Sequence, residues 1–206
     1  MFAINYQQLF VSELSLIADS RPGLLLHSCC AVCSSHVISL LASHFSLSVF
    51  FYNPNIFPRS EYEKRKSEQK RLLLEVYGGA IDLIDADYEH DLYLDTVEGL
   101  EKCGEGGERC ELCFLLRLRK TAESARKLGF EYFCSTLSVS PHKSSAAINE
   151  AGMRASGESG IKWLPSDFKK RDGYLHSVRL AEQYGLYRQK YCGCEFAMSH
   201  LSETKQ

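Results

Sequence analysis

The chain has 206 residues, of which 45% are hydrophobic and 24% are charged, and its formal net charge is −2. These values are typical of a globular protein with one substantial core, and they exclude a strongly basic chain. No apolar stretch is long enough to span a bilayer, and the N-terminal segment lacks the basic start of a signal peptide, so we expect a cytoplasmic protein without membrane contact.

Short apolar runs alternate with amphipathic stretches along the chain. The apolar runs are bounded by polar residues, glycine or proline, which indicates strands, and the amphipathic stretches indicate helices. In chain order we predict a strand at 23–28, a helix at 34–44, a strand at 47–53, a helix at 60–77, a strand at 80–87, a helix at 107–129, a strand at 131–138, a helix at 142–151, a strand at 161–167 and a helix at 173–184.

This alternation predicts an α/β fold, in which a mostly parallel sheet is flanked by helices on both faces. Local signals mark some helix ends: Ser60 with Glu63 forms a capping box, and Gly129 ends the longest helix. No internal repeat or linker divides the sequence. We therefore expect a single α/β domain over residues 1–206, with residues 187–206 as a C-terminal segment.

Ligands of open α/β sheets bind beyond the carboxyl ends of the strands. The residues that follow the predicted strands should therefore share one edge of the sheet, and the helix that begins near Gly107 can bring further thiols there. The residues expected at this edge are Cys29, Cys30, Asn53, Pro54, Asp87, Tyr88, Ser140 and Asp167, together with Cys110 and Cys113 from the helix.

Most of the nine cysteines fall into three short segments, HSCCAVC, RCELC and YCGC. Because structural disulfides are rare in a reducing compartment, such clusters indicate metal or redox chemistry. The remaining two, Cys103 and Cys134, stand alone, and we expect them to behave as small apolar side chains.

Cys110 and Cys113 are three residues apart, so a helix places both sulfurs on one face. They also lie near the expected start of the helix, where the helix dipole stabilises negative charge and lowers a thiol's pKa. A metal centre is the favoured interpretation. A redox dithiol, or two buried cysteines, is the alternative.

Cys29 and Cys30, followed by Cys33, come directly after a strand. Nucleotide-binding proteins carry a glycine-rich phosphate loop at this turn, and its absence argues against ATP use. Four thiolates from the two segments can hold zinc or an iron–sulfur cluster. Adjacent cysteines are unusual for structural zinc, so we favour a cluster held by Cys29, Cys30, Cys110 and Cys113.

Cys192 and Cys194 are separated by one glycine. A disulfide in so small a ring is strained and easily reduced, which suits a redox-active pair. A second metal-binding pair is the alternative.

Seven segments carry a resemblance to a known family. HSCCAVC, YNPNIFPRSEYEKR, DADY, GGERCELCFLLRL, STLSVSPHK, SDFKKRDGY and YRQKYCGC occur in the order found in the QueH family of epoxyqueuosine reductases, so residues 24–197 resemble that family. The resemblance implies a fold similar to the adenine-nucleotide α-hydrolase-like (HUP, Rossmann-like) three-layer domain. It also implies reduction of epoxyqueuosine to queuosine at the wobble position of tRNA, the last step of queuosine biosynthesis.

The same resemblance implies a [4Fe–4S] cluster on Cys29, Cys30, Cys110 and Cys113, and a redox-active pair at Cys192 and Cys194. It further implies a mononuclear iron beside the cluster, for which we expect Cys33 and Asp87 as ligands. The sequence departs from the family pattern at Cys134, where the family usually has threonine, and at Cys103, and neither position belongs to a motif.

The reaction needs an external electron donor, a proton donor and a surface that binds tRNA. We expect Asp87 and Tyr88 as catalytic groups, with His27 and Asp167 as further proton-donor candidates. Ordinary alternatives are a structural anchor for Tyr88 and a hydrogen-bonded core position for His27. The sequence contains four basic clusters, most of which are expected to be simply solvated helix faces. Those within Lys64–Arg71 and Lys169–Arg171, together with Phe57 and Tyr191, are candidates for contact with the anticodon loop. The clusters are Lys64–Lys66, Lys70–Arg71, Arg117 with Arg119–Lys120, and Lys169–Arg171.

Two other functions remain open from the residues. One is an ATP-dependent tRNA-thiolation enzyme on the same fold, against which the missing phosphate loop argues. The other is an ATP-independent zinc or iron–sulfur protein that only binds tRNA.

Overall fold

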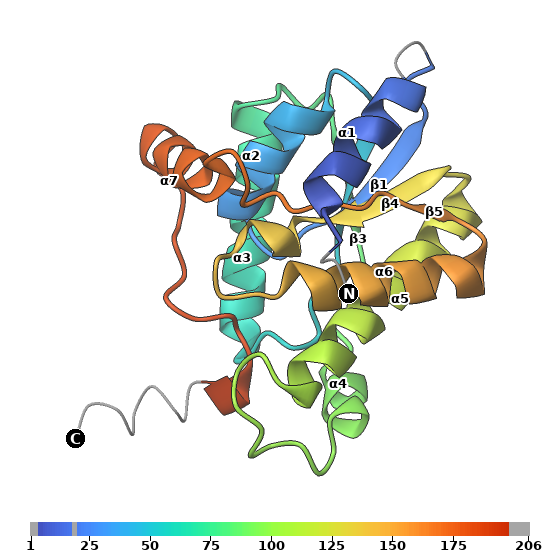
Figure 1. Cartoon of the computed structure of the whole chain (residues 1–206). Coiled ribbons are helices and arrows are strands. Elements are labelled where there is room, and N and C mark those ends of the chain that lie inside the picture. The colour runs from blue at the N-terminus through green and yellow to red at the C-terminus, as the bar shows by residue number, and fades with distance from the viewer. Residues whose placement is uncertain (1–3, 18–19, 198–206) are drawn as a thin grey trace.

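The computed structural model describes residues 4–17 and 20–197 and is built on one five-stranded parallel sheet (Figure 1). The strand order is β3-β2-β1-β4-β5, and every neighbouring pair is parallel. The central strand is apolar and fully buried at Leu24–Leu26, as expected for a strand covered on both faces. The strands are β1 (Gly23–His27), β2 (Ser46–Phe51), β3 (Asp82–Asp85), β4 (Tyr132–Ser135) and β5 (Lys162–Trp163).

Helices cover both faces of the sheet, which confirms the predicted three-layer α/β fold. On one side α2 packs against α3 and α7, and on the other α5 packs against α6 (Figure 1). None of the described helices has the length and hydropathy needed to cross a bilayer. The helices are α1 (Tyr6–Leu16), α2 (Ala31–Leu41), α3 (Arg59–Glu75), α4 (His90–Thr96), α5 (Glu108–Leu128), α6 (Ser145–Ser159) and α7 (Gly173–Gln183), with a 3-10 helix η1 at Thr136–Val139.

The chain reverses its direction across the sheet between β1 and β4. It runs from β1 outward to β2 and β3, and then returns to the other side of β1 as β4. Such a reversal is a topological switch point, where a crevice opens beyond the carboxyl ends of the two strands. Cys29, after β1, and Thr136, after β4, meet there, with 3.6 Å between Sγ and Oγ1.

Several local expectations differ from the structure. The predicted capping box is wrong, because α3 begins one residue earlier at Arg59 and Pro58 occupies the N-cap position. Glu63 instead forms ion pairs with Arg59 at 3.8 Å and with Lys66 at 3.6 Å. The helix expected at 34–44 begins at Ala31, which places Cys33 within its first turn.

The predicted end of α5 is confirmed, since Gly129 adopts the left-handed conformation with φ of 80°. The predicted C-terminal segment is described up to residue 197, and its residues 198–206 lie outside the described part of the chain. Residues 187–197, which we call the C-terminal strap, descend from α7 past α3 toward α4 (Figure 1).

Candidate functional site

The turn between β1 and α2 holds three thiols close together. The Sγ atoms of Cys29, Cys30 and Cys33 all lie within 4.8 Å of one another, and those of Cys29 and Cys30 are 4.0 Å apart. Adjacent cysteines can share one centre here because the chain bends sharply between the end of β1 and the start of α2. Hydrogen bonds from the thiols of Cys30 and Cys33 hold the pKa of Cys29 well below its ordinary value. This favours the thiolate, the form that binds metals.

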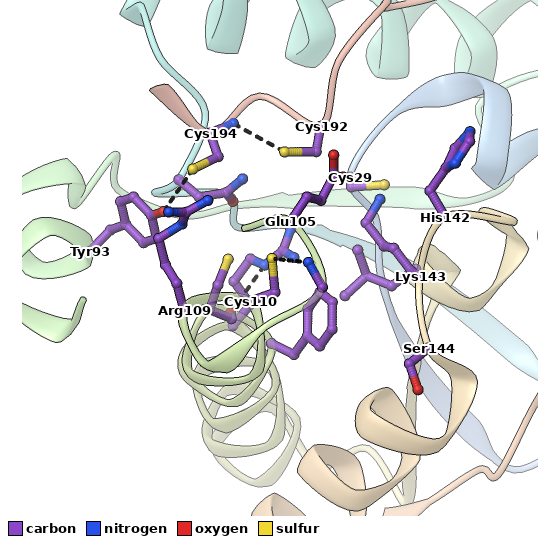
Figure 2. Close-up of a pocket in the computed structure, with 16 residues that line it drawn as sticks. Cys29, Tyr93, Glu105, Arg109, Cys110, His142, Lys143, Ser144, Cys192 and Cys194 are labelled. Atoms are coloured by element: carbon purple, nitrogen blue, oxygen red, sulfur yellow. Dashed lines mark hydrogen bonds between the residues drawn. The ribbon is translucent and has the colours of Figure 1, made fainter. Parts of the chain in front are cut away.

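A cavity of about 40 Å³ lies beside this turn, and we call it the sulfur cavity. Five thiols line it: Cys29 from the β1–α2 turn, Cys110 and Cys113 from the start of α5, and Cys192 and Cys194 from the C-terminal strap. Figure 2 shows the strap cysteines facing the start of α5 across the cavity. The fold therefore brings together three segments that are distant in the sequence.

The two remaining motif cysteines flank the sulfur cavity. Cys30 and Cys33 contact Cys29 but do not line the cavity themselves, and Cys33 faces a neighbouring, more open groove. All nine cysteines are described, and none forms a disulfide.

The expectation that the helix dipole lowers the thiol pKa is wrong for Cys113. Burial, with a further contribution from Cys194, raises the pKa of Cys113. Desolvation outweighs the helix dipole for this fully enclosed thiol. A bound cation is the natural way to stabilise its thiolate.

Two buried arginines line the sulfur cavity without an acidic partner. Arg109 is 1% exposed and Arg117 is 3% exposed, and neither forms an ion pair within the described part of the chain. Their guanidinium groups donate to neutral oxygens, such as the carbonyls of Leu100 and Glu101 and the side chain of Asn53. A buried cation is costly unless an anion compensates it. Glu105 and the thiols are the groups lining the cavity that can supply this negative charge.

Lys143 adds a third cation at the rim. Burial opposes its charge, but the thiols of Cys29, Cys33 and Cys192 outweigh this effect and raise the pKa of Lys143. Its ammonium group therefore stays protonated. The resulting excess of positive charge suits several thiolates, or a metal centre bound by thiolates.

Asn55 provides a free acceptor at the same cavity. It is 3% exposed, and its Oδ1 atom has no hydrogen-bond partner among the described residues. Buried polar atoms are normally hydrogen-bonded, and an unpaired one beside a cavity indicates a place for a ligand. The nitrogen Nε of Arg109 is unpaired in the same way.

Arg65 anchors the C-terminal strap to α3. Its side chain is buried, pairs with Glu61 at 2.7 Å, and donates to the backbone oxygens of Cys192 at 3.1 Å and Tyr191 at 3.3 Å. Gly193 lies in the left-handed region with φ of 107°, and a Cβ atom at this position would lie 2.8 Å from Ile56. The strap can therefore pack against Ile56 in this conformation only with glycine between the two cysteines.

Further contacts fix the strap to the loop after β2. The backbone N–H of Phe57 donates to the oxygen of Gly193 at 2.8 Å, and the Tyr191 hydroxyl donates to the oxygen of Phe57 at 2.7 Å. Beyond the cysteines, Glu195 lies 3.0 Å from Nε2 of His90. Together these contacts hold Cys192 and Cys194 over the sulfur cavity.

The two strap thiols differ in acidity. Hydrogen bonds from Cys192 and from the Tyr93 hydroxyl, which lies 3.1 Å from the sulfur, lower the pKa of Cys194. The pKa of Cys192 is raised by its hydrogen bond to Cys194 and by burial. The pair thus consists of one thiolate and one thiol, which is the form that reacts in thiol–disulfide chemistry.

The structure does not bring Asp87 or Tyr88 to the sulfur cavity. Both follow β3, which is the edge strand, and β2 separates it from β1. Asp87 is exposed and lines neither the sulfur cavity nor the open groove. The Tyr88 hydroxyl donates to the oxygen of Ile56 at 2.6 Å, and its ring stacks on His90. Tyr88 is therefore a structural anchor.

The other proton-donor candidates also have structural partners. His27 bonds the Ser135 hydroxyl and the oxygen of Tyr52, at 2.8 and 3.0 Å. Burial, together with Arg117, lowers its pKa to about 3, so the ring is neutral. Asp167 pairs with Lys169 at 2.7 Å and accepts from Ser145.

Most of the predicted basic clusters are neutralised by nearby carboxylates. These side chains are stabilised within the fold and are poor candidates for holding phosphates. The ion pairs are Arg65–Glu61, Lys66–Asp85, Arg71–Glu68, Arg71–Glu75, Arg119–Glu158, Lys120–Glu89 and Lys169–Asp167.

Several residues of the site were not predicted as such. Arg109, Cys113 and Arg117 are spaced four apart, so one face of α5 carries both arginines with the thiol. This spacing is visible in the sequence and points to a charged, cysteine-bearing helix face. Asn55 and Tyr93 carry no comparable signal, because only the folded chain brings them to the cavity.

Fold and site together define an α/β protein with a thiol-lined, positively charged centre at the switch point of a parallel sheet. The family described as epoxyqueuosine reductase QueH matches residues 24–200. The chain therefore belongs to the QueH family of epoxyqueuosine reductases, which places it among the oxidoreductases.

Individual relatives agree with this assignment, and each carries the name epoxyqueuosine reductase QueH. The chain is 44% identical to the protein of Streptococcus pyogenes serotype M1, over 86% of this chain and 71% of the relative. It is 40% identical to the protein of Staphylococcus epidermidis, over 86% of this chain and 76% of the relative. Identity to the protein of Thermotoga maritima is 35%, over 87% of this chain and 92% of the relative.

Proposed function

We propose that this chain reduces the epoxide of epoxyqueuosine at the wobble position of tRNA and so completes queuosine biosynthesis. Family membership supports the reaction. The observation that supports assigning the reaction to this site is that five thiols and two buried arginines without a described ion-pair partner line one cavity. The expected cytoplasmic location is part of the same proposal, since free thiols of this kind require a reducing compartment.

Cys29, Cys30, Cys110 and Cys113 are the proposed ligands of a [4Fe–4S] cluster. Soft thiolate donors are what such clusters require, and the surrounding cations fit the negative charge of a thiolate-bound cluster. A cluster held there would supply electrons one at a time. Cys33 is kept as a ligand of an additional iron, because its sulfur lies beside those of Cys29 and Cys30. Asp87 is not kept, because it lies away from these thiols.

Cys192 and Cys194 are the proposed source of two electrons. Converting the epoxide to an alkene consumes two electrons and two protons and releases one water. Oxidation of the Cys194 thiolate and the Cys192 thiol to a disulfide provides two electrons and one proton, the second proton comes from water, and an external reductant must then restore the pair. Tyr93 contributes by donating its hydroxyl hydrogen to Sγ of Cys194, which stabilises the reactive thiolate.

The thiolation alternative is not favoured. The turn after β1 carries Cys29 and Cys30 where an ATP-dependent enzyme of this fold needs glycine. A protein that only binds tRNA through zinc is distinguished by colour, because an iron–sulfur protein is brown and bleaches when dithionite reduces it.

An anaerobic turnover assay tests the proposal directly. Purified protein is given tRNA that contains epoxyqueuosine, together with a chemical reductant, and the nucleosides are analysed by mass spectrometry. We expect loss of one oxygen from the modified base and gain of queuosine. Failure of brown, iron-loaded protein to form queuosine with any low-potential donor would contradict the proposed function.

A further inference from the structure

A second cavity of about 450 Å³ opens beside the sulfur cavity, and we call it the entrance groove. It lies between α7, the C-terminal strap and the loop after η1. Five residues line both cavities and form the passage between them: Cys29, Glu105, His142, Lys143 and Cys192. The entrance groove is therefore a route by which a substrate can reach the thiols.

The volumes of the two cavities indicate which parts of the substrate each can hold. The sulfur cavity has room for only a few water molecules, since one water needs about 10–15 Å³ of such space. It cannot hold a whole nucleotide, and a cluster on its thiols would leave less room still. The sugar, the phosphates and the neighbouring bases must then lie in a larger space such as the entrance groove.

The charge of the entrance groove suits a polyanion. Arg188 and Lys190 line it, are exposed, and form no hydrogen bond or ion pair with any described residue. Lys143 adds a third positive charge, and among the described residues that line the groove Glu105 is the only one with a carboxylate. Many cations of the basic clusters elsewhere are held in internal ion pairs, whereas Arg188 and Lys190 are unpaired and line the groove that adjoins the sulfur cavity.

The groove also has an aromatic wall. Tyr174, at the start of α7, is 38% exposed and lines the groove. Tyr191 lies on the strap, where its hydroxyl bonds Phe57 and the guanidinium of Arg65 lies 5.2 Å from its ring. Unpaired cations beside an exposed aromatic ring are the combination with which proteins bind single-stranded RNA, through phosphate contacts and base stacking.

We propose that the entrance groove binds the RNA strand on either side of the modified nucleotide. Arg188 and Lys190 hold backbone phosphates, and Tyr174 stacks on a neighbouring base. This inference rests on the proposed function for the identity of the RNA. It adds the surface that holds it, which is different from the basic clusters that the sequence suggests.

The first test compares two charge-matched double variants. Arg188→Gln/Lys190→Gln removes one arginine and one lysine from the groove. Arg126→Gln/Lys127→Gln removes the same charges from the exposed last turn of α5, before β4 begins and so at the opposite end of the sheet. Affinity for an anticodon stem-loop RNA is measured at several salt concentrations with anaerobically purified, iron-loaded protein.

The groove variant should bind more weakly and depend less on salt. Two lost phosphate contacts reduce the slope of log affinity against log salt by about 1.4, since each contact to a single strand contributes about 0.7. The control variant should keep the wild-type slope. Equal slopes for the two variants would overturn the proposal.

The second test concerns stacking. Tyr174→Phe keeps the aromatic face and should bind like the wild type, whereas Tyr174→Leu should weaken binding by roughly tenfold. Similar affinities for the two variants would remove Tyr174 from the RNA contact. Circular dichroism and iron content confirm that each variant is folded.

Turnover separates this inference from the proposed function. With epoxyqueuosine-containing tRNA, Arg188→Gln/Lys190→Gln should raise KM and keep kcat, because it removes binding and leaves the sulfur cavity intact. If the wild type binds the RNA with the expected salt dependence but makes no queuosine, the proposed function is wrong, while the assignment of the entrance groove to RNA binding is retained. If the wild type makes queuosine and the groove variant has an unchanged KM, the groove assignment fails alone.

Discussion

Of the three regions that bring cysteines to the sulfur cavity, the β1–α2 turn and the C-terminal strap are held in different ways. The β1–α2 turn is continuous with the sheet: the N–H of Ser28 bonds the oxygen of Phe50, and the oxygen of Ser28 accepts from Asn53. The C-terminal strap contains no strand and is held by side-chain contacts, chiefly from Arg65 and Tyr191, besides the backbone hydrogen bond from Phe57 to Gly193. A rigid turn suits fixed metal ligands, whereas a strap held by a few hydrogen bonds suits thiols that must change partners during a reaction.

Removing one cysteine from the turn and one from the strap tests most sharply whether the two regions have different roles. Cys29→Ser should abolish both cluster binding and turnover, because it removes a ligand at the centre of the thiol group. Cys194→Ser should abolish turnover with the physiological or a dithiol reductant while the cluster remains. Iron and sulfide analysis beside the turnover assay checks both results. Full activity of Cys194→Ser would remove the dithiol from the mechanism.

Loosening the strap should have the next largest effect. Arg65→Met removes the hydrogen bonds to Tyr191 and Cys192, so the redox pair loses its position over the cavity. Turnover should fall by about 100-fold, the usual result of a misplacement near 1 Å, while iron content is retained. Arg59→Met on the same helix is the control, since Arg59 makes an exposed ion pair with Glu63 and lies 5.6 Å from the centre of the Tyr88 ring, but forms no hydrogen bond to the described residues of the strap. Equal activities of the two variants would show that the strap needs no anchor.

The buried charge around the cavity is tested at Arg117. Arg117→Met removes a cation without changing a thiol, so a bound cluster should become harder to reduce and should be lost about 10–100-fold more readily. Arg117→Lys restores the charge and should recover most of the potential. Electrochemical titration measures this shift, and an unchanged potential in Arg117→Met would contradict the electrostatic role.

The acidity of the strap thiols leads to a pH-dependent prediction. The pKa of Cys194 is lowered by Cys192 and Tyr93, so its thiolate persists at neutral pH and disappears only as the pH falls through that lowered pKa. Iodoacetamide should therefore modify Cys194 before Cys192 at pH 7. Tyr93→Phe removes one stabilising hydrogen bond and should shift the labelling profile of Cys194 to higher pH. Mass spectrometry of the labelled peptides measures both effects, and preferential labelling of Cys192 would reverse the assignment.

The smallest effect is expected at Cys103. It stands apart from the motifs and lines neither cavity. Cys103→Ser should keep iron content, affinity for RNA and turnover within about twofold of the wild type. A loss of cluster in this variant would mean that the ligand set is wrong.

The fold was largely predictable because its signals are local. Apolar runs bounded by glycine and polar residues identified all five strands, and Gly129 marked the end of α5. The ends of the strands were less predictable: the run at 131–138 becomes a four-residue strand followed by η1, where the Ser135 side chain caps the turn. The helices α1 and α4 were missed.

The site was predictable where its chemistry is carried by residue type. Cysteine clusters pointed to Cys29, Cys110 and Cys113, which do line one cavity. Asp87 and Tyr88 directly follow a strand, but this did not place them at the sulfur cavity. That ligands bind beyond the carboxyl ends of parallel strands does not say how far each strand lies from the switch point. Arg65 and Tyr93 act through long-range contacts, and Asn55 lines the cavity, which only the folded chain reveals.

Metal analysis of the anaerobically purified protein tests the central claim most directly. Iron, acid-labile sulfide and zinc are measured together, with Mössbauer spectra, in the wild type and in Cys110→Ser/Cys113→Ser. The account predicts one [4Fe–4S] cluster per wild-type chain and its loss from the double variant. Zinc without sulfide in the wild type, or an unchanged cluster in the double variant, would contradict it.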